Sequence, residues 1–281
     1  VFLITGLLVV LSSTNYVQKF SAYQGEFYPL LLGATLGMML MAGAGDLITL
    51  YVGLELMSIC FYVLVSYHMN DGKAPEAGIK YLVLNATSSA LFLYGISLLY
   101  GLTGSTKIVE ISGALADQMS PAVILALVFI LAGFAFKISL VPFHMWAPDV
   151  YEGAPTPIAA YLAVASKAAA FAALIRIYLL HLGEQAFAPA GETILLILAA
   201  ATMIMGNLMA IPQKNIKRLL AYSSISQAGY LMVGILAASA AGVKGVLFYS
   251  MIYIFASVGA FAVATHVGQA QGSDEISAYA G

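Results

Sequence analysis

Long apolar segments recur along this 281-residue chain, and they limit what it can fold into. A helix needs about 20 apolar residues to cross the hydrocarbon core of a bilayer. Inside lipid every backbone polar group must find a partner within the protein, which a helix achieves by itself. The sequence therefore predicts an all-α, polytopic transmembrane helix bundle with eight full spans at 27–44, 47–67, 77–102, 121–141, 158–181, 193–211, 219–236 and 245–267. A partial span is expected at 1–11, followed by a polar connection at 12–26.

The composition agrees with a membrane protein and speaks against several other classes. Hydrophobic residues make up 62% of the chain and charged residues only 9%, whereas soluble domains carry about 25% charged residues. The 11 basic and 13 acidic residues nearly balance, so no nucleic-acid partner is predicted. The single Cys60 lies in an apolar run, and we interpret it as a small buried hydrophobe. No His/Cys/Asp/Glu cluster has metal-ligand spacing and no phosphate-binding glycine loop is present, so we predict that this chain binds neither a metal nor a cofactor.

Residues 1–281 are expected to form one membrane domain. The first apolar segment is too short to span and the last residues stop in an unfinished segment, so we interpret the chain as an internal fragment truncated at both ends. Residues 104–120 mix apolar and polar positions, which is typical of a short helix on the membrane surface.

The basic residues predict an orientation in the membrane. Alternating the connections places one group of them on the same side: Lys19, Lys73, Lys80, Lys214, Lys217 and Arg218. The other side receives Lys107 and Lys244, with Arg176 close by. Because basic loops stay in the cytoplasm, the loops at 68–80 and 212–218 are predicted to be cytoplasmic.

Residues 132–149 carry a lysine with no charged neighbour beside a helix break. Pro142 has no backbone N–H, so we predict a broken helix around Lys137–Pro142 with a shorter helical piece after it. The following residues 149–157 are rich in helix breakers and are predicted to be a connector. A lysine at membrane depth costs about 2.5–3.5 kcal/mol on insertion scales and usually faces a bundle interior or a wet cavity.

Two further charges lie inside apolar spans, Glu55 and Lys167. Together with Lys137 they place one ionisable group on each of three spans, none with a countercharge on its own helix, which favours a proton relay. His144 titrates near neutral pH and is a possible fourth member. The alternative is a set of structural ion pairs that lock helices together, with His144 hydrogen-bonded near the interface beside Trp146, an aromatic of the membrane–water belt.

A weak internal repeat is visible between residues 56–65 and 224–233, which both follow a span and a short turn. The shift of 230 − 62 = 168 residues corresponds to about five helices. Repeats with an odd number of helices invert their topology, as in many transporters. We therefore predict part of an inverted repeat.

Four stretches resemble the antiporter-like membrane subunits of proton-pumping NADH:quinone oxidoreductase (respiratory complex I), and the resemblance runs over essentially the whole chain. They are Gly-Leu-Glu-Leu-Met-Ser at 53–58, the segment 136–157 from Phe-Lys-Ile-Ser to Ala-Pro-Thr-Pro, Ser-Lys-Ala-Ala-Ala-Phe at 166–171, and 215–225. The form Tyr-Glu-Gly-Ala-Pro-Thr-Pro at 151–157 is closer to one paralogue than to the others, which look more like His-Thr-Glu-Ala-Pro-Thr-Pro.

This resemblance implies that Glu55 and Lys137 form a pair whose separation modulates proton affinity, and that Lys167 continues the path toward a central hydrophilic axis. The broken helix would be one of two related by the inverted repeat, the second lying outside this chain. Gln227 stands where the family often has histidine, so we assign it no proton role.

The resemblance also implies where the redox chemistry takes place. NADH, flavin, iron–sulfur clusters and quinone are expected in partner subunits, beside this chain in a bacterial plasma membrane. The alternatives are a subunit of a multi-subunit cation/proton antiporter or of a membrane-bound hydrogenase, and a scaffold whose charges are structural.

Overall fold

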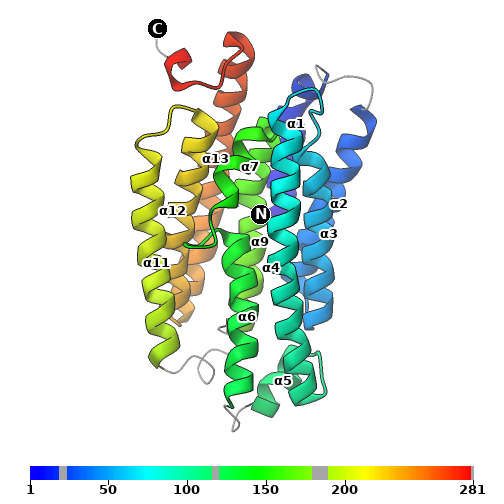
Figure 1. Ribbon diagram of the computed structural model, residues 1–281, viewed down its shortest axis with the longest axis vertical. Coiled ribbons are helices and arrows are strands. Elements are labelled where there is room, and N and C mark those ends of the chain that lie inside the picture. The colour runs from blue at the N-terminus through cyan, green and yellow to red at the C-terminus, as the bar shows by residue number, and fades with distance from the viewer. Residues whose placement is uncertain (19–23, 116–119, 179–188, 280–281) are drawn as a thin grey trace.

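The computed structural model describes residues 1–18, 24–115, 120–178 and 189–279, and these form a bundle of roughly parallel and antiparallel helices (Figure 1). Its elements in chain order are α1 (Phe2–Val17), α2 (Gln24–Gly43), α3 (Leu47–Val65), α4 (Lys73–Thr103), α5 (Ile108–Leu115), α6 (Pro121–Ile138), α7 (Trp146–Gly153), α8 (Thr156–Tyr161), the π-helix η1 (Leu162–Ser166), α9 (Lys167–Ile177), α11 (Pro189–Ala210), α12 (Ile216–Leu236), α13 (Ala240–Gln271) and the short 3-10 turn η3 (Ile276–Tyr279). Eight helical stretches within the described residues are long and apolar enough to cross a membrane. The predicted all-α bundle of eight spans is confirmed.

The boundary of the partial span is corrected. Helix α1 continues to Val17, through residues that we predicted to be a polar connection. The hydroxyl groups of Ser12, Ser13 and Thr14 donate to carbonyl oxygens one turn earlier in the same helix. Because these side chains bond back to their own helix, three consecutive polar residues remain helical.

The helix break is confirmed, but it starts before the proline. Helix α6 ends at Ile138, and Ser139 adopts a left-handed backbone conformation with φ 61°. The N–H groups of Ser139 and Leu140 then donate to the carbonyls of Phe136 and Ala135, which closes the helix. Ser139 therefore ends the helix, and Pro142 lies in the turn that follows.

The predicted connector at 149–157 is wrong in its first half. Residues 146–153 form helix α7, so only Ala154 and Pro155 separate it from α8. The next span is continuous but contains the π-helix η1, which ends immediately before Lys167. A π-turn inserts one extra residue per turn and is common at functional sites.

Two hairpins pack through glycine. A Cβ atom on Gly37 of α2 would lie 2.5 Å from the backbone nitrogen of Met57 on α3. Likewise a Cβ on Gly206 of α11 would lie 2.6 Å from the nitrogen of Ser226 on α12. Both contacts let the helices approach backbone to backbone. The hairpins carry the two halves of the proposed repeat, which itself stays a prediction.

The basic residues lie at opposite ends of the bundle, as alternation requires. The start of α4, the end of α7 and the turn between α11 and α12 share one end with η3, while α5 lies at the other end (Figure 1). Lys73, Lys80 and Arg218 are bound there to acidic residues of α7. Lys107 directly precedes α5 at the far end, and Lys19 falls outside the described residues. Which end faces the cytoplasm stays a prediction.

Candidate functional site

Lys137 lies at the end of α6 in a fully formed polar cage. Its side chain is 1% exposed. The Nζ atom donates to Ser58 Oγ at 2.7 Å, Asn85 Oδ1 at 2.8 Å and Tyr81 Oη at 3.2 Å. An ammonium group has three N–H donors, so all of them are satisfied.

The cage is built from one face of each of two helices. Helical spacing of three or four residues brings side chains onto a common face. The polar residues at this spacing are Glu55, Ser58 and Tyr62 on α3, and Tyr81, Asn85 and Ser89 on α4. These residues were not predicted to be part of the site, because the prediction rested on charged residues. Polar side chains at helical spacing in both spans are visible in the sequence.

The cage oxygens are themselves held in place. Ser58 Oγ donates to the carbonyl of Leu54 at 2.5 Å, and Asn85 Nδ2 donates to Tyr62 Oη at 2.5 Å. Lys137 thus contacts only neutral oxygens within the described residues.

Glu55 lies one helical turn away from this cage and does not contact Lys137. Its carboxylate accepts a hydrogen bond from Ser89 Oγ. Glu55 precedes Ser58 by three residues and Ser89 follows Asn85 by four, so the two pairs occupy successive turns, about 5.4 Å apart. The structural ion pair that we considered as an alternative is absent for Glu55 in the described part of the chain.

Lys167 is the second buried lysine, and its side chain is 3% exposed. Its Nζ donates to both the carbonyl and the Oγ of Ser224 on α12, each at 2.9 Å. A cavity beside it is lined by Gln227 and Tyr253. Its volume of about 10 Å³ is near the lower limit for holding one water molecule. Like Lys137, Lys167 has no carboxylate partner among the described residues.

Three buried polar atoms without hydrogen-bond partners lie on the chain between the two lysines. They are Ser139 Oγ, His144 Nδ1 and Tyr151 Oη, considering the residues that the structure describes. Buried polar atoms of this kind usually bind ordered water. His144 lies in the turn after α6, off any helix. It is nevertheless within electrostatic range of Lys167.

The interpretation of Trp146 as an interfacial aromatic is wrong. Its side chain is buried, and its ring stacks on Tyr81 at 4.9 Å and on Phe136 at 5.4 Å between ring centroids. The Nε1–H group donates to the Phe136 carbonyl at 2.9 Å. The Phe136 carbonyl, which also accepts from the Ser139 N–H, thus has two donors at the helix break.

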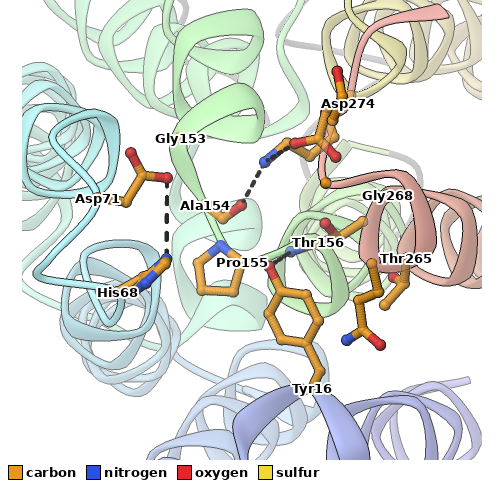
Figure 2. A pocket seen from close by; sticks show the side chains of 14 residues that line it. Tyr16, His68, Asp71, Gly153, Ala154, Pro155, Thr156, Thr265, Gly268 and Asp274 are labelled. Atoms are coloured by element: carbon orange, nitrogen blue, oxygen red, sulfur yellow. Dashed lines mark hydrogen bonds and ion pairs between the residues drawn. The ribbon is translucent and has the colours of Figure 1, made fainter. Parts of the chain in front are cut away.

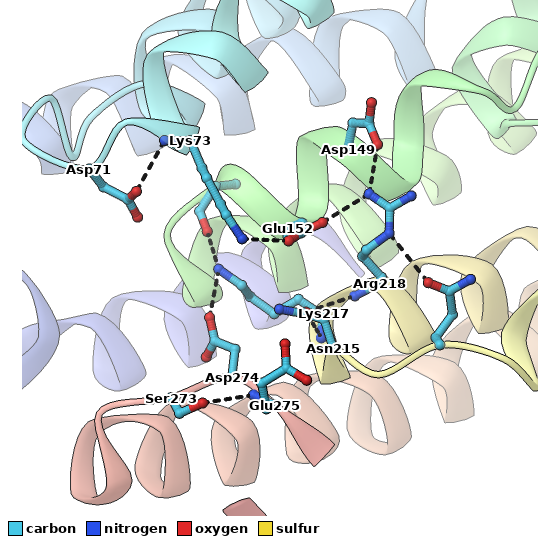
Figure 3. Close-up of polar contacts among 12 residues, drawn as sticks. Asp71, Lys73, Asp149, Glu152, Asn215, Lys217, Arg218, Ser273, Asp274 and Glu275 are labelled. Atoms are coloured by element: carbon cyan, nitrogen blue, oxygen red, sulfur yellow. Dashed lines mark hydrogen bonds and ion pairs between the residues drawn. The ribbon is translucent and has the colours of Figure 1, made fainter. Parts of the chain in front are cut away.

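An ionic cluster, which the sequence did not reveal, fixes α7 at one end of the bundle (Figure 3). Arg218 Nη1 lies 2.6 Å from Asp149 Oδ1 and 2.9 Å from Glu152 Oε2. Lys80 also pairs with Asp149 at 2.9 Å, and Lys73 with Glu152 at 2.8 Å. Burial works against ionisation of the two carboxyl groups, but these cations outweigh it and hold the pKa of both Asp149 and Glu152 below the usual range.

A polar pocket of about 390 Å³ opens beside this cluster (Figure 2). Its walls include Tyr16, His68, Asp71 and the Ala154–Pro155 break. Lys217 binds the carbonyl of Ala154 at 3.2 Å and Asp274 at 3.1 Å. A liquid water occupies about 30 Å³, so the pocket has room for several. In the described residues, no group of three or more His, Cys, Asp or Glu side chains is placed to hold a metal ion.

Two lysines are thus buried among neutral oxygens, with a helix break between them. The family described as "NADH:quinone oxidoreductase/Mrp antiporter, TM" matches residues 44–281. The chain belongs to this family. The resemblance seen in the sequence is confirmed.

Relatives within the family are closely similar over this whole chain. An NADH-quinone oxidoreductase subunit N from Desulfitobacterium hafniense is 64% identical over 296 residues, covering 100% of this chain and 60% of the relative. A chain in respiratory complex I from Thermus thermophilus with bound aureothin has a TM-score of 0.78 and 39% identity, covering 97% of this chain and 58% of that one. A chain of an archaeal respiratory membrane complex, the membrane-bound sulfane sulfur reductase, has a TM-score of 0.85 and 31% identity. The match covers 98% of this chain and 57% of that one. This chain thus spans about 60% of the length of the relatives it matches.

Proposed function

We propose that this chain belongs to a proton-translocating membrane subunit of NADH:quinone oxidoreductase, of the subunit N type, and that Glu55, Lys137 and Lys167 carry the proton. The observation that carries the proposal is the pair of buried lysines, each held by neutral oxygens and without a carboxylate contact in the described residues. The 64% identity to a subunit N supports this assignment within the family.

Neutral cages suit a proton carrier for a chemical reason. A hydroxyl group accepts a hydrogen bond from an ammonium and can donate one to a neutral amine after its own rotation. Ser58, Tyr81 and Ser224 supply such hydroxyl groups. A carboxylate would instead favour the charged lysine strongly. Lys137 and Lys167 can therefore gain and lose a proton without leaving a buried group unpaired.

The path runs from Glu55 to Lys137 and then to Lys167. A change of charge near Glu55 acts on Lys137 across about one helical turn of low-dielectric protein. The proton then crosses the segment of unpaired polar atoms, where His144 and water bridge toward Lys167. Redox chemistry is assigned to partner subunits holding NADH, flavin, iron–sulfur clusters and quinone, and the complex to a bacterial plasma membrane with the loops at 68–80 and 212–218 in the cytoplasm.

Substitution of Lys137 tests the proposed function. Lys137→Met in the full-length subunit removes the ionisable group but keeps an unbranched side chain of similar length. We expect normal assembly, and a lower number of protons translocated per NADH oxidised by the reconstituted complex. Lys244→Met is the matched control, because Lys244 is exposed at the start of α13.

An unchanged ratio of protons to NADH in Lys137→Met would remove Lys137 from the path. It would favour the scaffold alternative, in which the buried charges only hold helices together.

A subunit of a cation/proton antiporter complex or a membrane-bound hydrogenase is the second candidate, because the matching family also covers Mrp antiporters. Genes for the other NADH dehydrogenase subunits beside this one would support the first candidate. Sodium-dependent transport by a complex without NADH oxidation would support the second.

A further inference from the structure

Helix α7 touches both lysine sites, although it carries neither lysine. At its first residue, Trp146 stacks on Tyr81, whose hydroxyl group binds Lys137. In its middle, the Tyr151 phenol lies beside the Ser224 hydroxyl, which binds Lys167. Tyr151 Oη is fully buried and has no hydrogen-bond partner in the described part of the chain. Eight residues therefore connect the surroundings of Lys137 to those of Lys167.

No helix continues into α7 at either end, so its position depends on contacts with other helices. The turn at 141–145 precedes it and the Ala154–Pro155 break follows it, so neither neighbouring helix extends into it. Its polar anchors are Asp149 and Glu152 (Figure 3), which precede and follow Tyr151 in the sequence. Four ion pairs from two other helices hold these carboxylates.

Arg218 is the central cation of this cluster. One nitrogen, Nη1, binds both carboxylates, whereas Lys73 and Lys80 each bind one carboxylate of α7 and are more exposed. Exposed lysine pairs contribute little, because solvent screens them. Arg218 also lies on α12, six residues before Ser224, about 9 Å along the same rigid helix. It therefore ties α7 directly to the helix that holds Lys167.

We propose that Arg218 is a positioning residue for both buried lysines and acts through α7. By fixing Asp149 and Glu152 it sets where Trp146 meets the Tyr81 ring and where Tyr151 meets Ser224. The proposal rests on the proposed function, since it assumes that Lys137 and Lys167 carry protons. It adds a residue at the end of the bundle that contacts neither lysine.

Arginine substitutions in the complete complex test this proposal. Arg218→Gln removes the charge, and we expect proton pumping per assembled complex to fall about tenfold or more, because small misplacements of a reacting group have effects of this size. Arg218→Lys keeps a cation on a shorter side chain and loses the Nε donor to Gln213, so it should restore part of the loss. Lys107→Gln, which breaks the exposed pair with Glu110 at the other end of the bundle, is the matched control and should pump normally.

Tyr151→Phe tests the link to Lys167, because it removes only the buried hydroxyl group. We expect it to lower pumping by itself. Tyr161→Phe is its control: Tyr161 is as deeply buried, and its Oη contacts Thr35, away from both lysines. The double variant of Arg218→Gln and Tyr151→Phe should lose less than the product of the two single losses, since both act on one element.

The variants distinguish failure of the positioning role from failure of the proposed function. Full pumping by Arg218→Gln or by Tyr151→Phe, or losses that simply multiply in the double variant, would overturn the proposal. If Arg218→Gln fails to assemble, Arg218→Lys combined with Tyr151→Phe gives the same comparison. If Lys137→Met pumps normally, the proposed function fails. If Lys137→Met loses pumping while the Arg218 variants keep it, only the positioning role fails.

Discussion

Lys137 shows at the residue scale how a charge is kept inside a membrane protein without a countercharge. Three neutral oxygens from two helices receive its three N–H groups, and a tyrosine ring lies 5.3 Å from its nitrogen. Ser58 and Asn85 are each held by a further hydrogen bond and the Tyr81 ring stacks on Trp146, so the cage exists before a proton arrives. Asn85 links two side chains of the site, because it accepts from Lys137 and donates to Tyr62.

Removing Asn85 should therefore weaken both the fold and the site. Asn85→Leu leaves one lysine N–H and the Tyr62 oxygen without their partners, and hydrogen bonds to charged groups contribute about 1.5–3 kcal/mol. We expect a lower midpoint of thermal unfolding in detergent and slower pumping. Asn207→Leu is the control, since Asn207 lies on the exposed face of α11. Equal midpoints of thermal unfolding for the two variants would contradict the stabilising role of Asn85 in the cage.

The charged members of the site were predictable from the sequence, but their partners were not predicted. Charges within apolar spans are rare, so Glu55, Lys137 and Lys167 stand out on composition alone. Ser58, Tyr81 and Asn85 carry no charge, and only their helical spacing distinguishes them. The position of His144 was not predictable, because a left-handed residue at Ser139 ends the helix and changes its direction.

Elements pack here at close range, and glycine makes this possible. The helices of the α2–α3 hairpin meet at Gly37, opposite the backbone of Met57. The spans were predicted from their apolar length, whereas α7 was predicted only in part, because Pro148 and Gly153 indicate helix breaks. Its Pro148 lies in the first turn, where a missing N–H costs nothing, and Gly153 is its last residue. The π-helix η1 left no signal in the sequence that we can identify.

Gly37→Ala tests the close contact of this hairpin. A methyl group would lie 2.5 Å from a backbone nitrogen, so the helices must separate, and overpacking of this kind costs about 1–3 kcal/mol. We expect a lower thermal midpoint. Gly101→Ala in α4 is the matched control, because nothing lies within 4 Å of its added Cβ and alanine favours the helix. A stabilised Gly37→Ala variant would show that the helices are not in contact there.

At the scale of the whole molecule, segments distant in sequence combine into two sites. The Lys137 cage joins α3, α4 and α6, and the ionic cluster joins α4, α7 and α12. The sequence predicted the number of spans and which basic residues share an end, because both follow from length and alternation. It did not predict that Lys73, Lys80 and Arg218 meet acids of α7, since that depends on how the helices are arranged around one another.

The central claim is that Lys137 and Lys167 are successive stations of one proton path. The most direct measurement is the number of protons translocated per NADH oxidised for Lys137→Met, Lys167→Met and the double variant in reconstituted complexes. One path in series predicts that each single variant lowers the ratio to the same value and that the double variant lowers it no further. A double variant with a lower ratio than either single one, or a single variant with an unreduced ratio, would contradict the account.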